Sequence, residues 1–346
     1  MAKQRKLDGI FGLSTSSDSS LISLIPVPWE VTTSYGRGTS LGPAAIFAAS
    51  PQIDLFDLRY GSAYTAGFFW NADSLTDKLR KQNDRLKPLA EQVIAEWNDE
   101  GSLSSREAMS NLETVNTGCA EMVDLIHKRT TSILSENKIP GVVGGDHSTP
   151  LGAIRAVCEK YGHNTVGILH IDAHADLRLS YQGFQFSHAS IMRNVCALKT
   201  SPKNLIQVGI RDFCQEEMDF INENGSRVHT HFDLEIKRNL FSGKAWLALC
   251  EQIANELPLH VYISFDIDGL SPDLCPHTGT PVPGGLSFDQ ASFLLETVAR
   301  SGKQIVGFDL NEVTPGPDGD EWDGNVGARI LFQLCSWAAV TNKRPN

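Results

Sequence analysis

Two short segments carry acidic and imidazole side chains at alternating positions. Asp172, His174 and Asp176 stand two residues apart, and Asp266 and Asp268 repeat this spacing. On extended backbone, side chains spaced in this way point to the same face. Several carboxylates cannot share a site that excludes water unless cations accompany them, because burying an isolated charge is very costly. The pattern therefore predicts that these side chains bind metal.

A third segment, Gly144–Ser148, adds the imidazole of His147. The candidate ligands are then four carboxylates and two imidazoles, namely His147, Asp172, His174, Asp176, Asp266 and Asp268. One divalent ion cannot use so many protein ligands and keep an open position, whereas two ions can. This ligand set favours Mn²⁺, with Fe²⁺, Co²⁺, Ni²⁺ or Zn²⁺ as alternatives. The negative charges of four carboxylates balance the positive charges of two divalent ions. Paired metals also lower the pKa of a water that bridges them, so that this water becomes a nucleophile.

Short apolar segments precede these residues and are expected to position them. The sequence predicts strands at 21–27, 141–144, 166–171, 205–210, 228–232, 261–265 and 305–308. They alternate with helix-length segments, which is typical of an α/β protein whose parallel sheet is covered on both faces. Four of the strands run directly into acidic or imidazole residues, those at 141–144, 166–171, 261–265 and 305–308. Since ligands bind beyond the carboxyl ends of such strands, one rim of the sheet is the expected site.

The intervening segments predict helices at 74–98, 105–137, 150–161, 188–198, 216–224, 244–256, 288–300 and 325–338. Ser287 is the expected N-cap of the helix at 288–300. No repeat and no linker divides the sequence, so we expect a single domain over residues 1–346. The polar, helix-prone stretch 71–107 is expected to be a peripheral helical insertion.

Composition excludes several classes of protein. The 41 Asp and Glu residues outnumber the 30 Lys and Arg residues, and the net charge of −11 argues against nucleic acid or an anionic membrane as a partner. The seven cysteines are scattered and form no Cys-x-x-Cys pair, so neither a disulfide framework nor a zinc ribbon is indicated. No signal peptide or membrane-spanning segment is recognised, and a cytoplasmic location is the expectation.

Taken together, the motifs resemble the ureohydrolase family, which includes arginase and agmatinase; they are residues 144–148, 172–176, 264–268 and 278–281. The resemblance extends from residues 26–29 near the start to Glu312. It implies a three-layer α/β/α arginase-like fold with a mostly parallel central sheet. It also implies two Mn²⁺ ions per subunit (with Ni, Fe or Co as alternatives), hydrolysis of a guanidino group to urea and an amine, and a trimeric or hexameric homo-oligomer.

By position, the resemblance assigns the six ligands to two metals that share two bridging carboxylates. One metal is expected to bind His147, Asp172, Asp176 and Asp266, and the other His174, Asp172, Asp266 and Asp268. In this scheme Asp172 and Asp266 are the bridges.

The resemblance also implies catalytic and substrate-binding residues. Asp176 is expected to orient the bridging hydroxide and later to pass a proton to the leaving amine. Glu312 is expected to pair with the guanidinium group and hold its carbon over the hydroxide. His188 is expected to shuttle protons or contact the substrate, and Thr280 to contact the substrate.

Four positions depart from the family pattern or leave alternatives open. Ser271 replaces an acidic residue that is not among the assigned ligands, so the metal site is expected to survive. Cys275 and His277 either line the pocket or fill its loop. His170 is either a hydrogen-bond partner of a metal ligand or a satisfied core histidine, and the second interpretation is favoured.

The substrate is less well defined than the reaction. Residues 177–193 are more similar to agmatinase-type members than to arginase, so a small cationic guanidino substrate, agmatine, is expected to yield putrescine and urea. Arg178 would favour a carboxylate tail if it faces the pocket, but a structural pairing with an acid is the favoured interpretation. The alternative substrates are arginine, guanidinobutyrate, guanidinopropionate, formiminoglutamate and free guanidine. Two other classes are a single-zinc deacetylase of the same fold and a metal-free binding protein.

Overall fold

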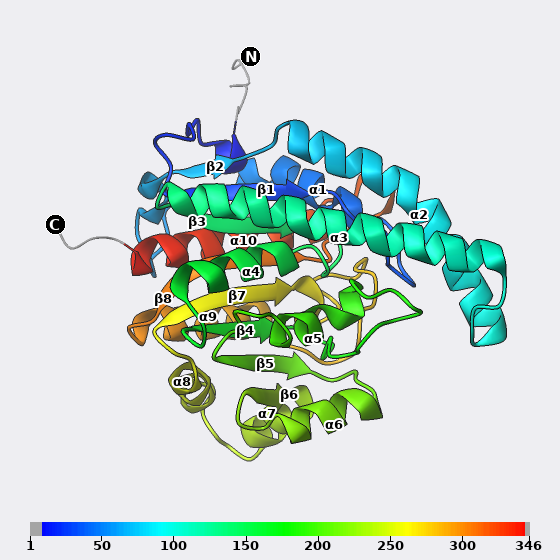
Figure 1. Cartoon of the computed structure of the whole chain (residues 1–346). Helices are drawn as coiled ribbons and strands as arrows, with labels where there is room; N and C mark the ends of the chain where they lie inside the picture. Colours follow the sequence, from blue (N-terminus) through cyan, green and yellow to red (C-terminus); the bar gives the residue numbers. More distant parts are fainter. Residues whose placement is uncertain (1–8, 343–346) are drawn as a thin grey trace.

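The computed structural model describes residues 9–342 and has one eight-stranded sheet in which every strand pair is parallel (Figure 1). The order is β2-β1-β3-β8-β7-β4-β5-β6. The strands are β1 (Ile22–Val27), β2 (Phe68–Trp70), β3 (Ile139–Gly144), β4 (Val166–Ile171), β5 (Asn204–Ile210), β6 (Val228–Phe232), β7 (His260–Asp266) and β8 (Gln304–Asn311). Seven of them were expected from the sequence, and β2 was not.

Helices cover both faces of this sheet. They are α1 (Gly42–Ala49), α2 (Ser74–Glu100), α3 (Arg106–Ser135), α4 (Leu151–Tyr161), α5 (Ile191–Cys196), α6 (Gln215–Glu223), α7 (Asp233–Phe241), α8 (Trp246–Glu256), α9 (Phe288–Arg300) and α10 (Trp322–Thr341). One apolar core joins the sheet to helices α1 and α7 to α10, and a second core joins it to α2 to α6. Successive strand residues enter opposite cores, as Ile168 and Leu169 of β4 do. This confirms the three expected layers.

Local sequence explains where several helices begin. Ser287 accepts a hydrogen bond from the backbone of Gln290, whose side chain bonds back, so the expected N-cap of α9 is confirmed. Residues 188–198, expected to be one helix, form a 3₁₀ turn at His188–Ser190 and then α5. Within residues 9–342, no helix is long and apolar enough to cross a membrane.

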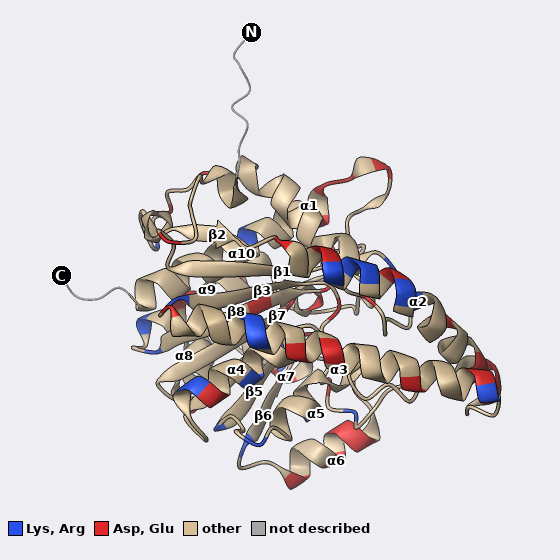
Figure 2. Cartoon of the chain, turned by 45° about the horizontal axis from the view of Figure 1, so that its top comes forward, with Lys and Arg blue, Asp and Glu red and all other residues tan. Residues whose placement is uncertain are grey.

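Helices α2 and α3 pack against each other, and the ends at which they are joined project beyond the carboxyl ends of the strands (Figure 1). Asp73 caps the start of α2, and Gly101 ends it in the left-handed conformation. Both helices carry acidic and basic residues (Figure 2), and some of these, such as Lys78 in α2 and Glu107 in α3, are exposed. All of α2 lies within the stretch 71–107 that the sequence predicts to be a peripheral insertion.

The four strands predicted to carry the site are neighbours at the centre of the sheet, in the order β3-β8-β7-β4. All four are parallel, so their carboxyl ends meet at one rim. The fold therefore brings together residues that lie up to 165 positions apart, such as His147 and Glu312.

Candidate metal centre and active-site pocket

The first group of candidate ligands surrounds the ring of His147. Its Nδ1 lies 2.9 Å from Oδ2 of Asp172, 3.1 Å from Oδ2 of Asp266 and 3.4 Å from Oδ2 of Asp176. This nitrogen is buried and forms no hydrogen bond with any residue that the structure describes. Buried polar atoms are nearly always hydrogen-bonded, so a nitrogen that faces three carboxylate oxygens without such a bond fits a ligand of a cation.

The second group surrounds His174. Its Nδ1 lies 3.1 Å from Oδ2 of Asp268 and 3.5 Å from Oδ1 of Asp172. Asp172 therefore presents one oxygen to each group, as a bridging carboxylate must. Asp266 turns Oδ2 toward His147, while its Oδ1 accepts a hydrogen bond from the backbone of Asp268 at 2.9 Å. The bridging role expected of Asp266 stays a prediction.

The protonation of the cluster shows how much negative charge it holds. Burial, reinforced by neighbouring carboxylates, raises the pKa of Asp176 and Asp266 well above the usual range. Burial alone would raise the pKa of Asp172 as well, but the surrounding imidazoles hold it well below its usual range. Burial alone would lower the pKa of His174, but the facing carboxylates raise it to about 12. Without cations, protons must balance the charge, so metal binding would release them.

A second set of contacts orients His147. Its Nε2 lies 2.9 Å from the Ser264 hydroxyl, which donates to Oδ1 of the buried Asp309 at 2.9 Å. Since that hydroxyl gives its proton to Asp309, it accepts from Nε2–H, and the Nδ1 lone pair is left for a cation. Ordered partners of this kind are typical of metal-binding histidines. Burial raises the pKa of Asp309 to about 6.

His170 is fully buried and contacts the carboxylate of Asp172, so it is a hydrogen-bond partner of a candidate ligand rather than only a core residue. Its Nε2 lies 2.8 Å from Oδ2 of Asp172. Gln207 donates from Nε2 to Nδ1 of this ring at 3.0 Å and to the carbonyl of Ala175 at 2.8 Å. Oε1 of Gln207 accepts from the Thr230 hydroxyl, which fixes the orientation of the amide. The network thus assigns the ring proton to Nε2, from which it is donated to Asp172.

Glu312 lies beside the candidate metal ligands rather than on the cavity wall. Its backbone has φ of +63°, and its Oε1 accepts a hydrogen bond from the amide of His147 at 2.8 Å. Burial, with the nearby charge of Asp146, raises the pKa of Glu312 to about 8. Its Oε2 points toward Gly279, 3.8 Å from the position that a Cβ there would occupy. One carboxylate oxygen is therefore already engaged, and the clamping of a guanidinium stays a prediction.

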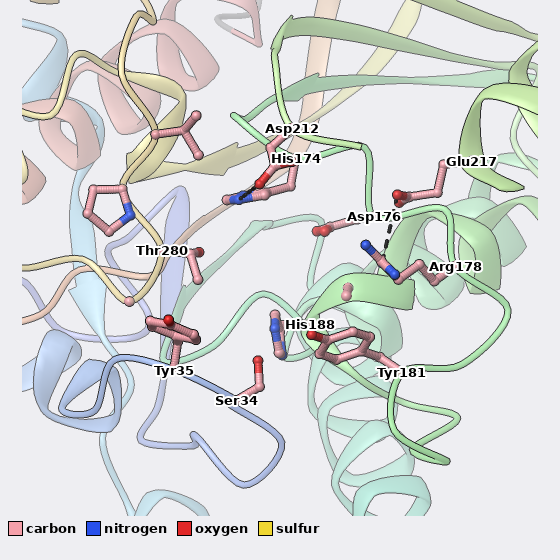
Figure 3. A pocket seen from close by; sticks show the side chains of 14 residues that line it. Ser34, Tyr35, His174, Asp176, Arg178, Tyr181, His188, Asp212, Glu217 and Thr280 are labelled. Atoms are coloured by element: carbon pink, nitrogen blue, oxygen red, sulfur yellow. Dashed lines mark ion pairs between the residues drawn. The ribbon is translucent and has the colours of Figure 1, made fainter. Parts of the chain in front are cut away.

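A cavity of about 520 Å³ opens onto this centre (Figure 3). Five of the predicted residues line it: His174, Asp176, Arg178, His188 and Thr280. The sequence interpretation missed further polar lining residues, which are Ser34, Tyr35, Tyr181, Asp212 and Glu217. Asp212 lies two residues after the end of β5, so the expectation that site residues follow the carboxyl ends of strands could have identified it.

His188 occupies the cavity wall opposite Tyr35 (Figure 3). Its ring packs edge-on against Tyr181, with the ring centres 5.9 Å apart. Burial, followed by the charges of His174 and His147, lowers the pKa of His188 to about 4. The ring is therefore neutral near pH 7, and its lowered pKa makes it a weak base.

Arg178 satisfies both interpretations that the sequence left open. It lines the cavity, and its Nε also lies 3.7 Å from Oε2 of Glu217 (Figure 3). Its guanidinium group is 5.0 Å from the ring centre of Tyr181. The Glu217 carboxylate additionally accepts hydrogen bonds from the backbone of Leu177 and Cys214.

Cys275 and His277 fill and anchor their loop instead of lining this cavity. The buried thiol of Cys275 contacts the carbonyl of Ile267 at 3.2 Å. Nδ1 of His277 lies 2.8 Å from Oδ2 of Asp323, at the start of α10. Of the alternatives left open for these two residues, the structure supports loop filling.

Comparisons with known proteins agree with this geometry. The model of the arginase family matches residues 20–336. An agmatinase from Bacillus subtilis is 32% identical over 212 residues, which cover 61% of this chain and 68% of that enzyme. A guanidinobutyrase from Pseudomonas aeruginosa is 27% identical over 331 residues, covering 93% of this chain and 88% of that enzyme.

A solved structure has the same fold. The agmatine ureohydrolase of Thermoplasma volcanium superimposes with a TM-score of 0.68 at 23% identity, over 95% of each chain. This likeness confirms the arginase-like α/β fold. The family match, together with the paired His and Asp clusters, leaves the deacetylase and the metal-free binding protein without support. The chain belongs to the arginase family of ureohydrolases.

Proposed function

We propose that this chain hydrolyses agmatine to putrescine and urea at a centre of two Mn²⁺ ions. The observation that carries the dinuclear assignment is the position of Asp172, whose two oxygens face the His147 group and the His174 group. Carboxylate and imidazole ligands without a thiolate suit Mn²⁺. A homo-oligomer, trimeric or hexameric, belongs to the same proposal.

The six predicted ligands would hold the metal ions. When bound, two divalent ions would supply a water of lowered pKa and positive charge to stabilise the transition state. Asp176, like His174, is both a candidate metal ligand and a residue of the cavity wall. Its carboxylate can accept a proton from the attacking water and return it to the leaving amine. His188 lines the same cavity and would contact the substrate or relay a proton, although its lowered pKa makes it a weaker base than an ordinary imidazole.

Negative charge on the cavity wall favours a substrate with a cationic tail. Asp212 is exposed at the cavity, so the ammonium group of agmatine would meet negative charge there, whereas the buried carboxylate of Glu217 is already paired with Arg178. The agmatinase relative gives independent support. Glu312 would hold the guanidinium through the oxygen that its bond to His147 leaves available.

Arg178 favours a second candidate, 4-guanidinobutyrate, because a cation on the cavity wall can pair with a carboxylate tail. The guanidinobutyrase relative is consistent with this alternative. Replacing Arg178 with Gln separates the two candidates. If the substrate is agmatine, the variant keeps or improves kcat/KM for agmatine; if it is guanidinobutyrate, the variant loses kcat/KM for that compound selectively.

A urea-release assay tests the proposal. The protein, loaded separately with Mn²⁺, Ni²⁺ and Co²⁺, is given agmatine, 4-guanidinobutyrate, 3-guanidinopropionate, arginine and guanidine, and formiminoglutamate is followed by loss of substrate. We expect the highest kcat/KM for agmatine with Mn²⁺. A higher kcat/KM for another guanidino compound would mean that this compound, and not agmatine, is the substrate, while the proposed reaction would stand. Turnover of none of them by metal-loaded protein would overturn the proposal.

A further inference from the structure

Helix α2 turns two polar side chains inward, toward the segment that joins β1 to α1. Asn83 is buried and Lys87 is largely buried, whereas Lys78 and Lys81 of the same helix are exposed. The inward side chains both reach Glu30, a buried acid three residues after the end of β1. Helix α2, which the sequence predicts to be peripheral, therefore contacts a buried residue of the protein interior through these two side chains.

Glu30 is bonded at both its backbone and its carboxylate. Its amide donates to Oδ1 of Asn83 at 2.8 Å, and its Oε1 forms an ion pair with the ammonium group of Lys87. Its Oε2 accepts from the amides of Gly38 at 2.7 Å and Ser40 at 3.0 Å. One carboxylate thus joins α2 to both ends of the loop 30–40.

The part of the loop between these ends forms a wall of the cavity. Ser34 and Tyr35 line the cavity on the side facing His188 and Tyr181 (Figure 3). The amide of Gly36 donates to the carbonyl of Gly279 at 3.2 Å, so the loop also packs against the segment that carries Thr280. A displacement of this loop would change the shape of the cavity, and none of the six candidate ligands belongs to the loop.

Two ion pairs join this loop to α2, and they differ in burial. Arg37 lies 3.2 Å from Glu91 of α2, but the side chain of Arg37 is 70% exposed. Exposed pairs contribute little to stability. The side chains of Lys87 and Glu30 are only 14% and 8% exposed, so removing one partner leaves a buried charge without compensation. The buried pair is therefore the connection that should hold the loop.

We propose that Lys87 and Glu30 are positioning residues through which α2 holds the loop 30–40 as the wall of the substrate cavity. The helical stretch 74–100 is then part of the apparatus that determines substrate affinity. The role toward substrate rests on the proposed function, whereas the role in holding the loop does not depend on it.

The test combines hydrogen exchange with kinetics on the full-length, metal-loaded protein. In Lys87→Met, we expect amide exchange in the loop 30–40 to become about tenfold faster, with exchange in β4 and β7 unchanged. We expect KM for agmatine to rise about fivefold or more while kcat changes less than about twofold and metal content is unchanged. Glu91→Gln, which breaks only the exposed pair, is the matched control and should leave both readouts near wild type.

The double variant Lys87→Met with Glu30→Gln removes both charges and so avoids an unpaired buried charge. It should still show faster exchange in the loop 30–40, because the carboxylate that joins the loop to α2 is gone. Exchange in that loop equal to wild type in the double variant would overturn the proposal, as would an equal effect in Glu91→Gln. The protein could also release no urea from agmatine while the variants still show faster amide exchange in the loop 30–40. In that case the role of the ion pair in holding the loop would stand, and agmatine would be rejected as the substrate.

Discussion

Nδ1 of His147 faces Oδ2 of Asp172 at 2.9 Å, yet this nitrogen forms no hydrogen bond to any described residue. The other nitrogen of the ring is engaged by Ser264, so the lone pair of Nδ1 is directed toward the carboxylates. The same carboxylate of Asp172 turns its second oxygen toward His174. These two contacts make Asp172 the residue on which both proposed metal sites would depend.

Replacing Asp172 with Asn should remove metal from both positions. The amide keeps the size of the side chain but loses the negative charge that both groups use. We expect metal content to fall from about two ions per chain to less than one, and urea release to fall by at least about 10³-fold. Elemental analysis and the urea assay measure the two effects. Asp289→Asn, at an exposed position of α9, is the control, and full activity of Asp172→Asn would contradict the account.

Strand ends account for most of what the sequence could predict. His147, Asp172, Asp266 and Glu312 all follow or end strands that are neighbours in the sheet, so residue type and position sufficed to bring them together. The individual partners of each oxygen could not be predicted, because they depend on side-chain orientation at the meeting point of several strands.

Other elements were missed for physical reasons. Strand β2 has three residues and pairs only with β1, so its own sequence carries almost no periodic signal. Helix α1 begins with Gly42-Pro43 and is short, and its stability comes from packing against α10 rather than from helix propensity. The pairing of Glu30 with Lys87 spans 57 positions and exists only through tertiary structure.

Gln207→Glu should reverse the protonation of the His170 ring. A carboxylate at this position accepts from Nδ1–H, whereas the amide of Gln207 donates to Nδ1. Nε2 would then lose the proton that it gives to Asp172, and we expect metal affinity to fall about 10- to 100-fold. Nitrogen NMR of labelled histidine assigns the tautomer, and calorimetry gives the affinity. An unchanged tautomer would show that Gln207 does not fix it.

Glu312→Gln should separate substrate positioning from metal binding. Glu312 bonds the backbone of His147 but is not a predicted ligand, so we expect both metals to be retained. The neutral amide cannot form a charge-assisted pair with a guanidinium, and kcat/KM should fall about 10²-fold or more. Kinetics equal to wild type, with metal bound, would rule out the clamping role.

The raised pKa of Glu312 also predicts a pH dependence of stability in the metal-free protein. Burial raises this pKa to about 8, above the value in the unfolded chain, so the folded state binds the proton more tightly. The resulting stabilisation is fully present below the unfolded pKa and is lost as the pH rises through about 8. Urea denaturation of metal-free protein between pH 5 and pH 9 should therefore show a shallower loss of stability for Glu312→Gln than for wild type. Identical pH profiles would argue against this assignment.

The metal content of active protein tests the central claim most directly. Protein is loaded with Mn²⁺, freed of unbound metal, and analysed for metal and for urea release from agmatine in the same preparation. The account predicts about two Mn²⁺ per chain, with activity that disappears when a chelator removes the metal and returns when Mn²⁺ is restored. Full urea-releasing activity with no bound metal, or with a single ion per chain, would contradict it.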